Sequence, residues 1–167
     1  MIDFTKPQQY TLSIRLSTDG FSFSIYNPIH DNSLSTIEKE TDTSLSLTAN
    51  LKATFRESDF LNHSYKRVNI MMADKRFTIV PLELFEEEQA ELLFYHNHQK
   101  RENETVICNI LKKNNVAIIF GMDKSAHTFL SEQYPEAHFY SQSTPLIDYF
   151  SVKSRLGNSK KMYVSIH

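Results

Sequence analysis

The side chains best suited to hold a metal ion are His96 and His98, which stand two residues apart near the end of a predicted helix. Residues at that spacing do not share a helix face. Zinc requires three or four protein ligands in most sites, and the sequence has no other His or Cys cluster. We therefore predict no metal site, and we interpret the two histidines as a solvated helix end.

Cys108 and the run Glu86 to Glu88 are the candidates for nucleophilic and acid–base chemistry. Cys108 stands in the apolar run 106–111, where a free cysteine is usually an inert packing residue. Adjacent glutamates on a helix point in different directions, and acidic residues are common in a first helical turn. The sequence therefore predicts no catalytic residue.

Glycine-based phosphate sites are also excluded by the sequence. The chain has three glycines, Gly20, Gly121 and Gly157, and each is isolated. A loop that cradles a phosphate needs several backbone amides brought together by closely spaced glycines. Neither a Walker site nor a Rossmann site fits this pattern.

Composition indicates one folded domain without a charged binding tract. The 167 residues are 40% hydrophobic, and 18 basic residues face 20 acidic ones with no basic cluster. We expect no nucleic-acid partner, because such proteins carry a basic patch. The single cysteine excludes an internal disulfide, and neither a signal peptide nor an apolar run of about 20 residues is present, so we expect a cytoplasmic protein without a membrane span.

The segments that must position any site begin with a predicted hairpin. Apolar and polar residues alternate over 12–17 and 21–25, which is typical of half-buried strands. Asp19-Gly20 is a common two-residue hairpin loop with positive φ angles. This loop pairs Leu16 with Phe23 and Ile14 with Ile25, and it places every large apolar side chain on one face.

The rest of the chain is predicted to alternate between strands and helices. A third strand over 34–40 is an open alternative to a loop, and 43–61 is a helix unless 44–47 forms a strand. We predict two more hairpins, 68–72 with 76–80 and 106–111 with 116–120. The predicted helices are 86–101, one capped by Asp123, and one capped by Ser143 or Thr144 and ended at Gly157. A short strand at 137–140 separates the last two helices, and another follows at 162–166.

Four segments resemble an uncharacterised bacterial family, a domain of unknown function with an actin-like ATPase fold. They are YTLSIRLSTDGFSFSIY at 10–26, RFTIVPLELFEEE at 76–88, VAIIFGM at 116–122 and TPLIDYFSVKSR at 144–155. The resemblance covers the whole chain. It implies an α/β fold with a mixed sheet, of the actin-like ATPase or ribonuclease H-like kind, carrying an inserted small α+β subdomain similar to that of pilus-assembly and type II secretion actin-like proteins.

The resemblance also implies a division of the chain. Residues 1–157 would form an actin-like N-terminal domain, with the inserted subdomain at about 65–112, and 158–167 would be the first strand of an absent second half. Strand residues Met162, Val164 and Ile166 would then form an apolar C-terminal edge. We expect that edge to bind a protein partner or a second copy of the chain.

Relatives of this fold that bind nucleotides carry an Asp-x-Gly-Thr/Ser phosphate loop in the first hairpin. The residues standing there are Ser17-Thr18-Asp19-Gly20-Phe21, a different spacing followed by a bulky side chain. We therefore expect no cofactor and a non-catalytic interaction or scaffold domain. The alternative is an ATPase whose second half is missing, with Asp19 and Gly20 binding Mg-ATP. A third possibility, a ribonuclease H-like nuclease, would need several carboxylates around a metal pair.

Overall fold

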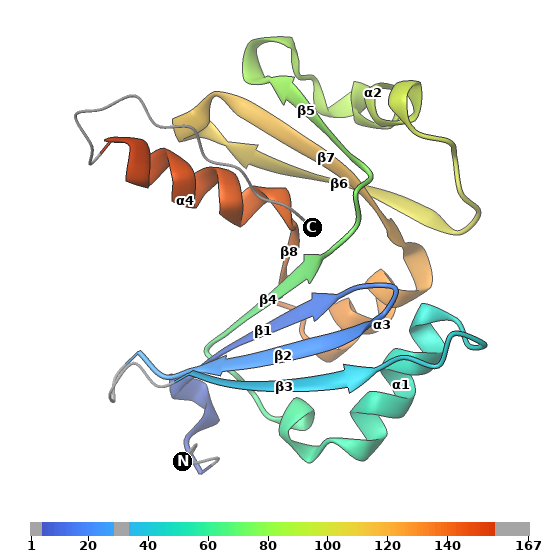
Figure 1. The fold of residues 1–167 in the computed structure, drawn as a ribbon, viewed down its shortest axis with the longest axis vertical. Helices are drawn as coiled ribbons and strands as arrows, with labels where there is room; N and C mark the ends of the chain where they lie inside the picture. Colours follow the sequence, from blue (N-terminus) through green and yellow to red (C-terminus); the bar gives the residue numbers. More distant parts are fainter. Residues whose placement is uncertain (1–4, 29–33, 156–167) are drawn as a thin grey trace.

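The computed structural model describes residues 5–28 and 34–155, which form two β-sheets and four α-helices (Figure 1). The larger sheet has five strands in the order β3-β2-β1-β4-β8, and the smaller has three in the order β5-β7-β6. Strands β1, β4 and β8 are parallel, while β2 is antiparallel to both β1 and β3. The larger sheet comprises β1 Thr11–Leu16, β2 Gly20–Tyr26, β3 Leu34–Glu40, β4 Arg67–Met72 and β8 His138–Ser141.

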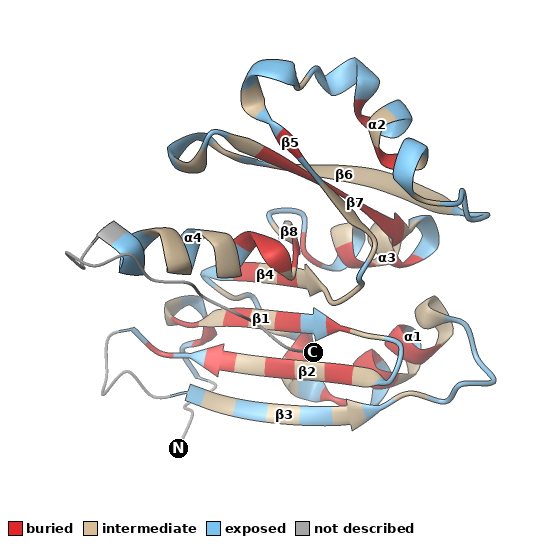
Figure 2. Cartoon of the chain, turned by 45° about the horizontal axis from the view of Figure 1, so that its top comes forward, coloured by how far each residue is buried: buried red, intermediate tan, exposed pale blue. Residues whose placement is uncertain are grey.

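Helices α1 Leu47–Glu57 and α3 Lys124–Gln133 cover one face of the larger sheet. The alternating apolar side chains of β1 and β2 meet Leu51, Phe55, Ala126 and Leu130 in this core. Figure 2 shows the resulting alternation of buried and half-buried positions along β1 and β2. The opposite face carries the polar members of the same alternation, and helix α4 Ser143–Arg155 lies on that side, between the two sheets (Figures 1 and 2).

The smaller sheet has an apolar cluster of its own. It consists of β5 Phe77–Pro81, β6 Glu104–Leu111 and β7 Val116–Asp123, and helix α2 Ala90–Asn97 packs on it. Val80, Ala90, Phe94 and Ile119 are buried between the helix and the sheet. The hairpin of β6 and β7 confirms the pairing of 106–111 with 116–120, and β7 is the central strand.

The first hairpin exists, but its predicted register is wrong by two residues. Leu16 lies opposite Phe21 and Ile14 opposite Phe23. The large apolar residues still share one face, because a shift of two positions preserves the side-chain alternation. The loop residues are Thr18 and Asp19 rather than Asp19 and Gly20, since the Ser17 amide donates to the Gly20 carbonyl at 3.1 Å.

Gly20 is needed for close approach and not for a positive φ angle. Only Asn103 and Asn115 have positive φ in the described part of the chain. Gly20 is the first residue of β2, and a Cβ atom there would lie 2.7 Å from the carbonyl oxygen of Lys39 on β3. Glycine is therefore required by the neighbouring strand.

The second predicted hairpin, 68–72 with 76–80, is wrong. β4 pairs with β1 on one side and with β8 on the other, so neither of its edges is open to β5. The amide of Ala73 donates to the Leu16 carbonyl at 2.8 Å and extends the first sheet by one further bond. The chain then turns at Asp74, and β5 starts the second sheet.

The remaining elements largely follow the predicted ones. The third strand is present at Leu34–Glu40, α1 replaces the strand considered at 44–47, and the strand predicted at 137–140 is β8. Asp123 caps α3 by accepting from the Ala126 amide at 2.8 Å. The acidic run 86–88 lies before α2, partly in a short 3-10 turn, because α2 begins at Ala90.

Two predictions near the end of the chain have different outcomes. Ser143 and Thr144 are the first residues of α4 instead of its cap, and the amide of Ser143 donates to the hydroxyl of Ser141 at 3.3 Å. The helix end at Gly157 and the strand at 162–166 lie outside the described residues.

Candidate functional site

The carboxyl edge of the larger sheet gathers the acidic residues that a nucleotide or metal site could use. β1, β3, β4 and β8 run in the same direction, so their carboxyl ends meet at one edge. Asp19 follows β1, Asp42 follows β3 and Asp74 follows β4. Ligands of α/β folds often bind at such an edge.

The hairpin at this edge is closed by its own hydrogen bonds. The Ser17 hydroxyl donates to the Gly20 carbonyl at 2.8 Å and accepts from the Gly20 amide at 3.2 Å. Asp19 is exposed at the turn, where Thr18 Oγ1 donates to its Oδ1 at 3.4 Å. The Gly20 amide is thus already engaged by the Ser17 hydroxyl.

The other two carboxylates of the edge also have partners. Asp42 accepts from the Ser44 hydroxyl at 2.6 Å and from the Ser44 amide at 2.9 Å, and these bonds lower the pKa of Asp42. Asp74 accepts from the Arg76 amide at 3.0 Å and forms an ion pair with Arg101 at 3.2 Å. Among the residues that the structure describes, no three His, Cys, Asp or Glu side chains are grouped so that they could hold a metal ion.

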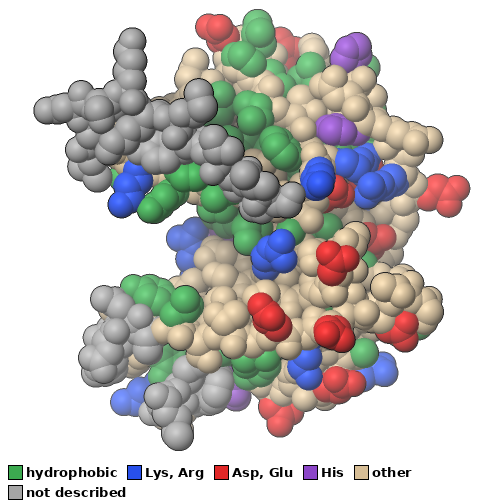
Figure 3. Space-filling model, viewed as in Figure 1, with side chains coloured by type: hydrophobic (Ala, Val, Ile, Leu, Met, Phe, Trp, Pro, Cys, Tyr) green, Lys and Arg blue, Asp and Glu red, His purple; other side chains and the backbone are tan. Residues whose placement is uncertain are grey.

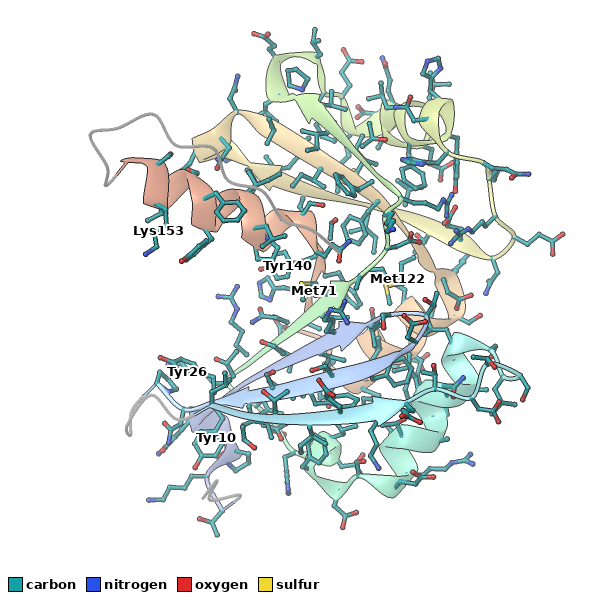
Figure 4. The ribbon with its side chains drawn as sticks, viewed as in Figure 1. Tyr10, Tyr26, Met71, Met122, Tyr140 and Lys153 are labelled. Atoms are coloured by element: carbon teal, nitrogen blue, oxygen red, sulfur yellow. The ribbon has the colours of Figure 1, made fainter. Side chains whose placement is uncertain are left out.

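A cavity lies elsewhere, on the polar face of the larger sheet. This sheet-face groove has a volume of about 810 Å³ and runs beneath α4 and the 3-10 turn η5 Lys112–Asn114. Figure 3 shows a hollow between the two halves of the molecule, bordered by Lys and Arg side chains. Met71 and Tyr140, from the adjacent strands β4 and β8, lie close together below α4 (Figure 4).

Among the charged side chains that line the sheet-face groove, most are basic. Arg15, Arg67, Lys112 and Lys113 line it, and Asp148 is the one acidic residue among the described lining residues. The polar side chains of the floor are Ser13, Ser22, Ser24 and Asn69. Apolar side chains border it, namely Met71, Ile110 and Pro145.

Arg67 is held in position by two neighbours on the groove floor. Its Nε donates to Asn69 Oδ1 at 2.9 Å, and its Nη2 donates to the Tyr140 hydroxyl at 3.0 Å. Both partners are neutral, and neither Arg67 nor Arg15 takes part in an ion pair within the described residues. No carboxylate of the described residues therefore pairs with either guanidinium.

The side chains considered for chemistry from the sequence lie apart from the groove. His96 is exposed, while His98 contacts the Phe94 ring at 4.7 Å between centroids and the Phe77 carbonyl at 3.2 Å. Burial, and to a smaller extent the charge of Glu87, raise the pKa of the Cys108 thiol. A raised pKa lowers the thiolate fraction at neutral pH and makes the thiol less reactive.

Sequence reasoning did not find the groove residues. Arg15 and Ser13 are the polar members of the β1 alternation, a signal that marks a solvent-facing side but no particular ligand. Arg67, Tyr140 and Lys112 come from three separate elements that only the tertiary fold brings around one hollow.

Comparison with known proteins shows the fold and the family of this chain. The chain resembles a solved structure from Bacteroides thetaiotaomicron VPI-5482, described as a protein with actin-like ATPase fold and unknown function, with a TM-score of 0.91 and 79% sequence identity. The match covers all of this chain and 65% of the other, so the chain spans about two thirds of that protein's length. Its fold is therefore the mixed α/β, actin-like ATPase fold that the sequence resemblance implied.

Residues 1–167 match the family of proteins of unknown function DUF3822, and the chain belongs to this family. No curated protein matches it. In the described part of the chain, no helix is long and apolar enough to cross a membrane.

Proposed function

We propose that this chain is a non-catalytic protein-interaction domain built on an actin-like fold. The observation that carries the proposal is the closed first hairpin, in which Ser17 accepts from the Gly20 amide. A phosphate loop needs such amides directed at the ligand. The engagement of Asp42 with Ser44 and of Asp74 with Arg101 supports the same conclusion, since both carboxylates already have partners within the chain.

The proposal includes the division of the chain into an actin-like domain over 1–157 and an inserted subdomain at about 65–112. The separate three-stranded sheet with its own apolar cluster supports an insertion, but its bounds differ from those of the sheet, since β4 belongs to the larger sheet and β7 continues the smaller sheet to Asp123. It also includes cytoplasmic localisation, and a protein partner or self-association at the C-terminal edge, 158–167. That edge lies outside the described residues.

The alternative is nucleotide binding by an actin-like ATPase, with Asp19 and Gly20 at the phosphates. The favouring observation is the description of the Bacteroides protein as having an actin-like ATPase fold. This chain spans only 65% of that protein. An ATPase would use the remaining part of such a protein for the second side of its nucleotide site.

Calorimetric titration of the chain with Mg-ATP separates the two functions. We expect no heat of binding at ATP concentrations up to about a millimolar, which corresponds to a binding free energy weaker than about 4 kcal/mol. A micromolar Kd that is lost in Asp19→Ala and retained in Asp59→Ala would overturn the proposal. Asp59 is an exposed acid that precedes β4 and serves as the control for a general loss of negative charge.

A further inference from the structure

We propose that the sheet-face groove binds an extended acidic segment of a partner protein. This inference rests on the proposed interaction function and names the chemistry of its partner. Among the described residues that line the cavity of about 810 Å³, four are basic and one is acidic, so its charge is complementary to carboxylates.

The spacing of the two arginines favours a peptide over a compact anion. In the β1–β4 register, Arg67 lies opposite Thr11, and Arg15 lies opposite Met71. The two arginine positions are thus four residues apart along the strand direction, which is roughly 13 Å at about 3.3 Å per residue. An extended peptide with acidic residues at every fourth position has the same spacing as the two arginines and can pair with each of them.

Both arginines project from the same face of the sheet. Along β1 and β4 they occupy the positions that alternate with the buried Leu12, Ile14 and Val68, so they lie on the other face of the sheet. Arg15 is exposed, and the bonds of Arg67 to Asn69 and Tyr140 restrain its guanidinium before a ligand arrives. A restrained donor loses less side-chain entropy on binding than a free one.

Apolar side chains line the groove beside the charged ones. Ile110, on β6, lines the groove and is 42% exposed. Met71 and the exposed Pro145 line the same groove. A partner segment that alternates acidic with aliphatic residues would fit both features, and its carboxylates would select against basic sequences.

The test is fluorescence anisotropy with a labelled twelve-residue peptide that carries glutamate at every fourth position and leucine, serine and glycine between. A peptide with lysine at the same positions is the ligand control. We expect saturable binding of the glutamate peptide, weakened about fivefold by Arg15→Gln and again by Arg67→Gln, and weakened further by added salt. Arg56→Gln, on the helix that covers the opposite face, removes the same charge and should leave the affinity unchanged.

Thermal melts of the variants show whether the fold is retained, and amide chemical shifts give a second readout in the unmodified chain. Peptide binding should shift the amides of Ser13 and Ser24 on the groove floor. The inference is overturned if the glutamate peptide does not bind, if the lysine peptide binds equally, or if Arg56→Gln weakens binding as much as Arg15→Gln. Displacement by inorganic tripolyphosphate at equal concentration would assign the groove to a small anion and overturn it too. None of these results affects the proposed function, which fails only by Asp19-dependent binding of Mg-ATP.

Discussion

Asn109 on β6 accepts a hydrogen bond from the hydroxyl of Thr144 on α4, with 2.7 Å between Oγ1 and Oδ1. The same Oδ1 accepts from the Ser141 amide at 3.0 Å, and Nδ2 donates to the Phe139 carbonyl at 2.8 Å. One amide side chain therefore joins the smaller sheet to the last strand of the larger sheet and to the helix that follows it. Thr144 is 4% exposed, so water does not replace this contact easily.

Replacing Thr144 by valine should destabilise the chain, because the shape is kept while a buried hydrogen bond is lost. We expect a loss of about 1 to 2 kcal/mol in the free energy of unfolding. Thr144→Ser, which keeps the hydroxyl, is the matched control and should retain more of the stability. Urea denaturation measures both, and equal stability of the valine variant and the unmodified chain would contradict the role of this bond.

Gly20→Val should lower the melting temperature because a Cβ atom would lie 2.7 Å from the Lys39 carbonyl oxygen. The strands β2 and β3 must separate locally to admit it, at a cost of about 1 to 3 kcal/mol. Ser22→Val on the same strand introduces the same side chain at a half-buried position and should cost much less. A Gly20→Val variant that melts like the unmodified chain would show that β2 and β3 are not held at this distance.

Gly121→Ala should destabilise the smaller sheet through the side chain of Glu104. A Cβ atom at position 121 would lie 2.7 Å from the Glu104 Cδ, and Glu104 is held there by its ion pair with Arg76 and by the Tyr95 hydroxyl. We expect a loss of about 1 to 3 kcal/mol.

A double-mutant cycle tests that cause. Glu104→Ala removes the obstacle but leaves the Arg76 side chain, which is 13% exposed, without its carboxylate. Gly121→Ala should therefore lower the free energy of unfolding less in the Glu104→Ala background than in the unmodified chain. Additive losses in the cycle would show that the two positions do not interact.

His127 should make the chain sensitive to mild acid. Burial lowers its pKa below the ordinary value of 6.5, and its ring packs on Phe139 with 4.4 Å between centroids. The unfolded chain then binds a proton more readily than the folded one, so this contribution to stability is present above about pH 6.5 and is lost as the pH falls through the lower folded pKa. His127→Gln should lose less stability between pH 7.5 and pH 5.5 than the unmodified chain. Parallel pH profiles of the two proteins in chemical denaturation would exclude this role for His127.

The sequence by itself determined the local features of this protein. Alternation placed the large side chains of β1 and β2 on one face, Asp123 marked the start of α3, and the apolar runs of β6 and β7 predicted their hairpin. These features depend on periodicity and on contacts between near neighbours, which a single sequence records. Resemblance to a known family supplied the actin-like fold.

Only the tertiary structure decided which strands pair and which side chains share a cavity. The first hairpin turns at Thr18-Asp19 with Gly20 close against β3, and β5 leaves β4 because β1 and β8 already occupy both edges of that strand. The sheet-face groove collects Arg15, Arg67 and Lys112 from segments far apart in the chain. Periodicity specifies the face that a side chain takes, but the partner across that face is chosen by long-range packing, which no local pattern encodes.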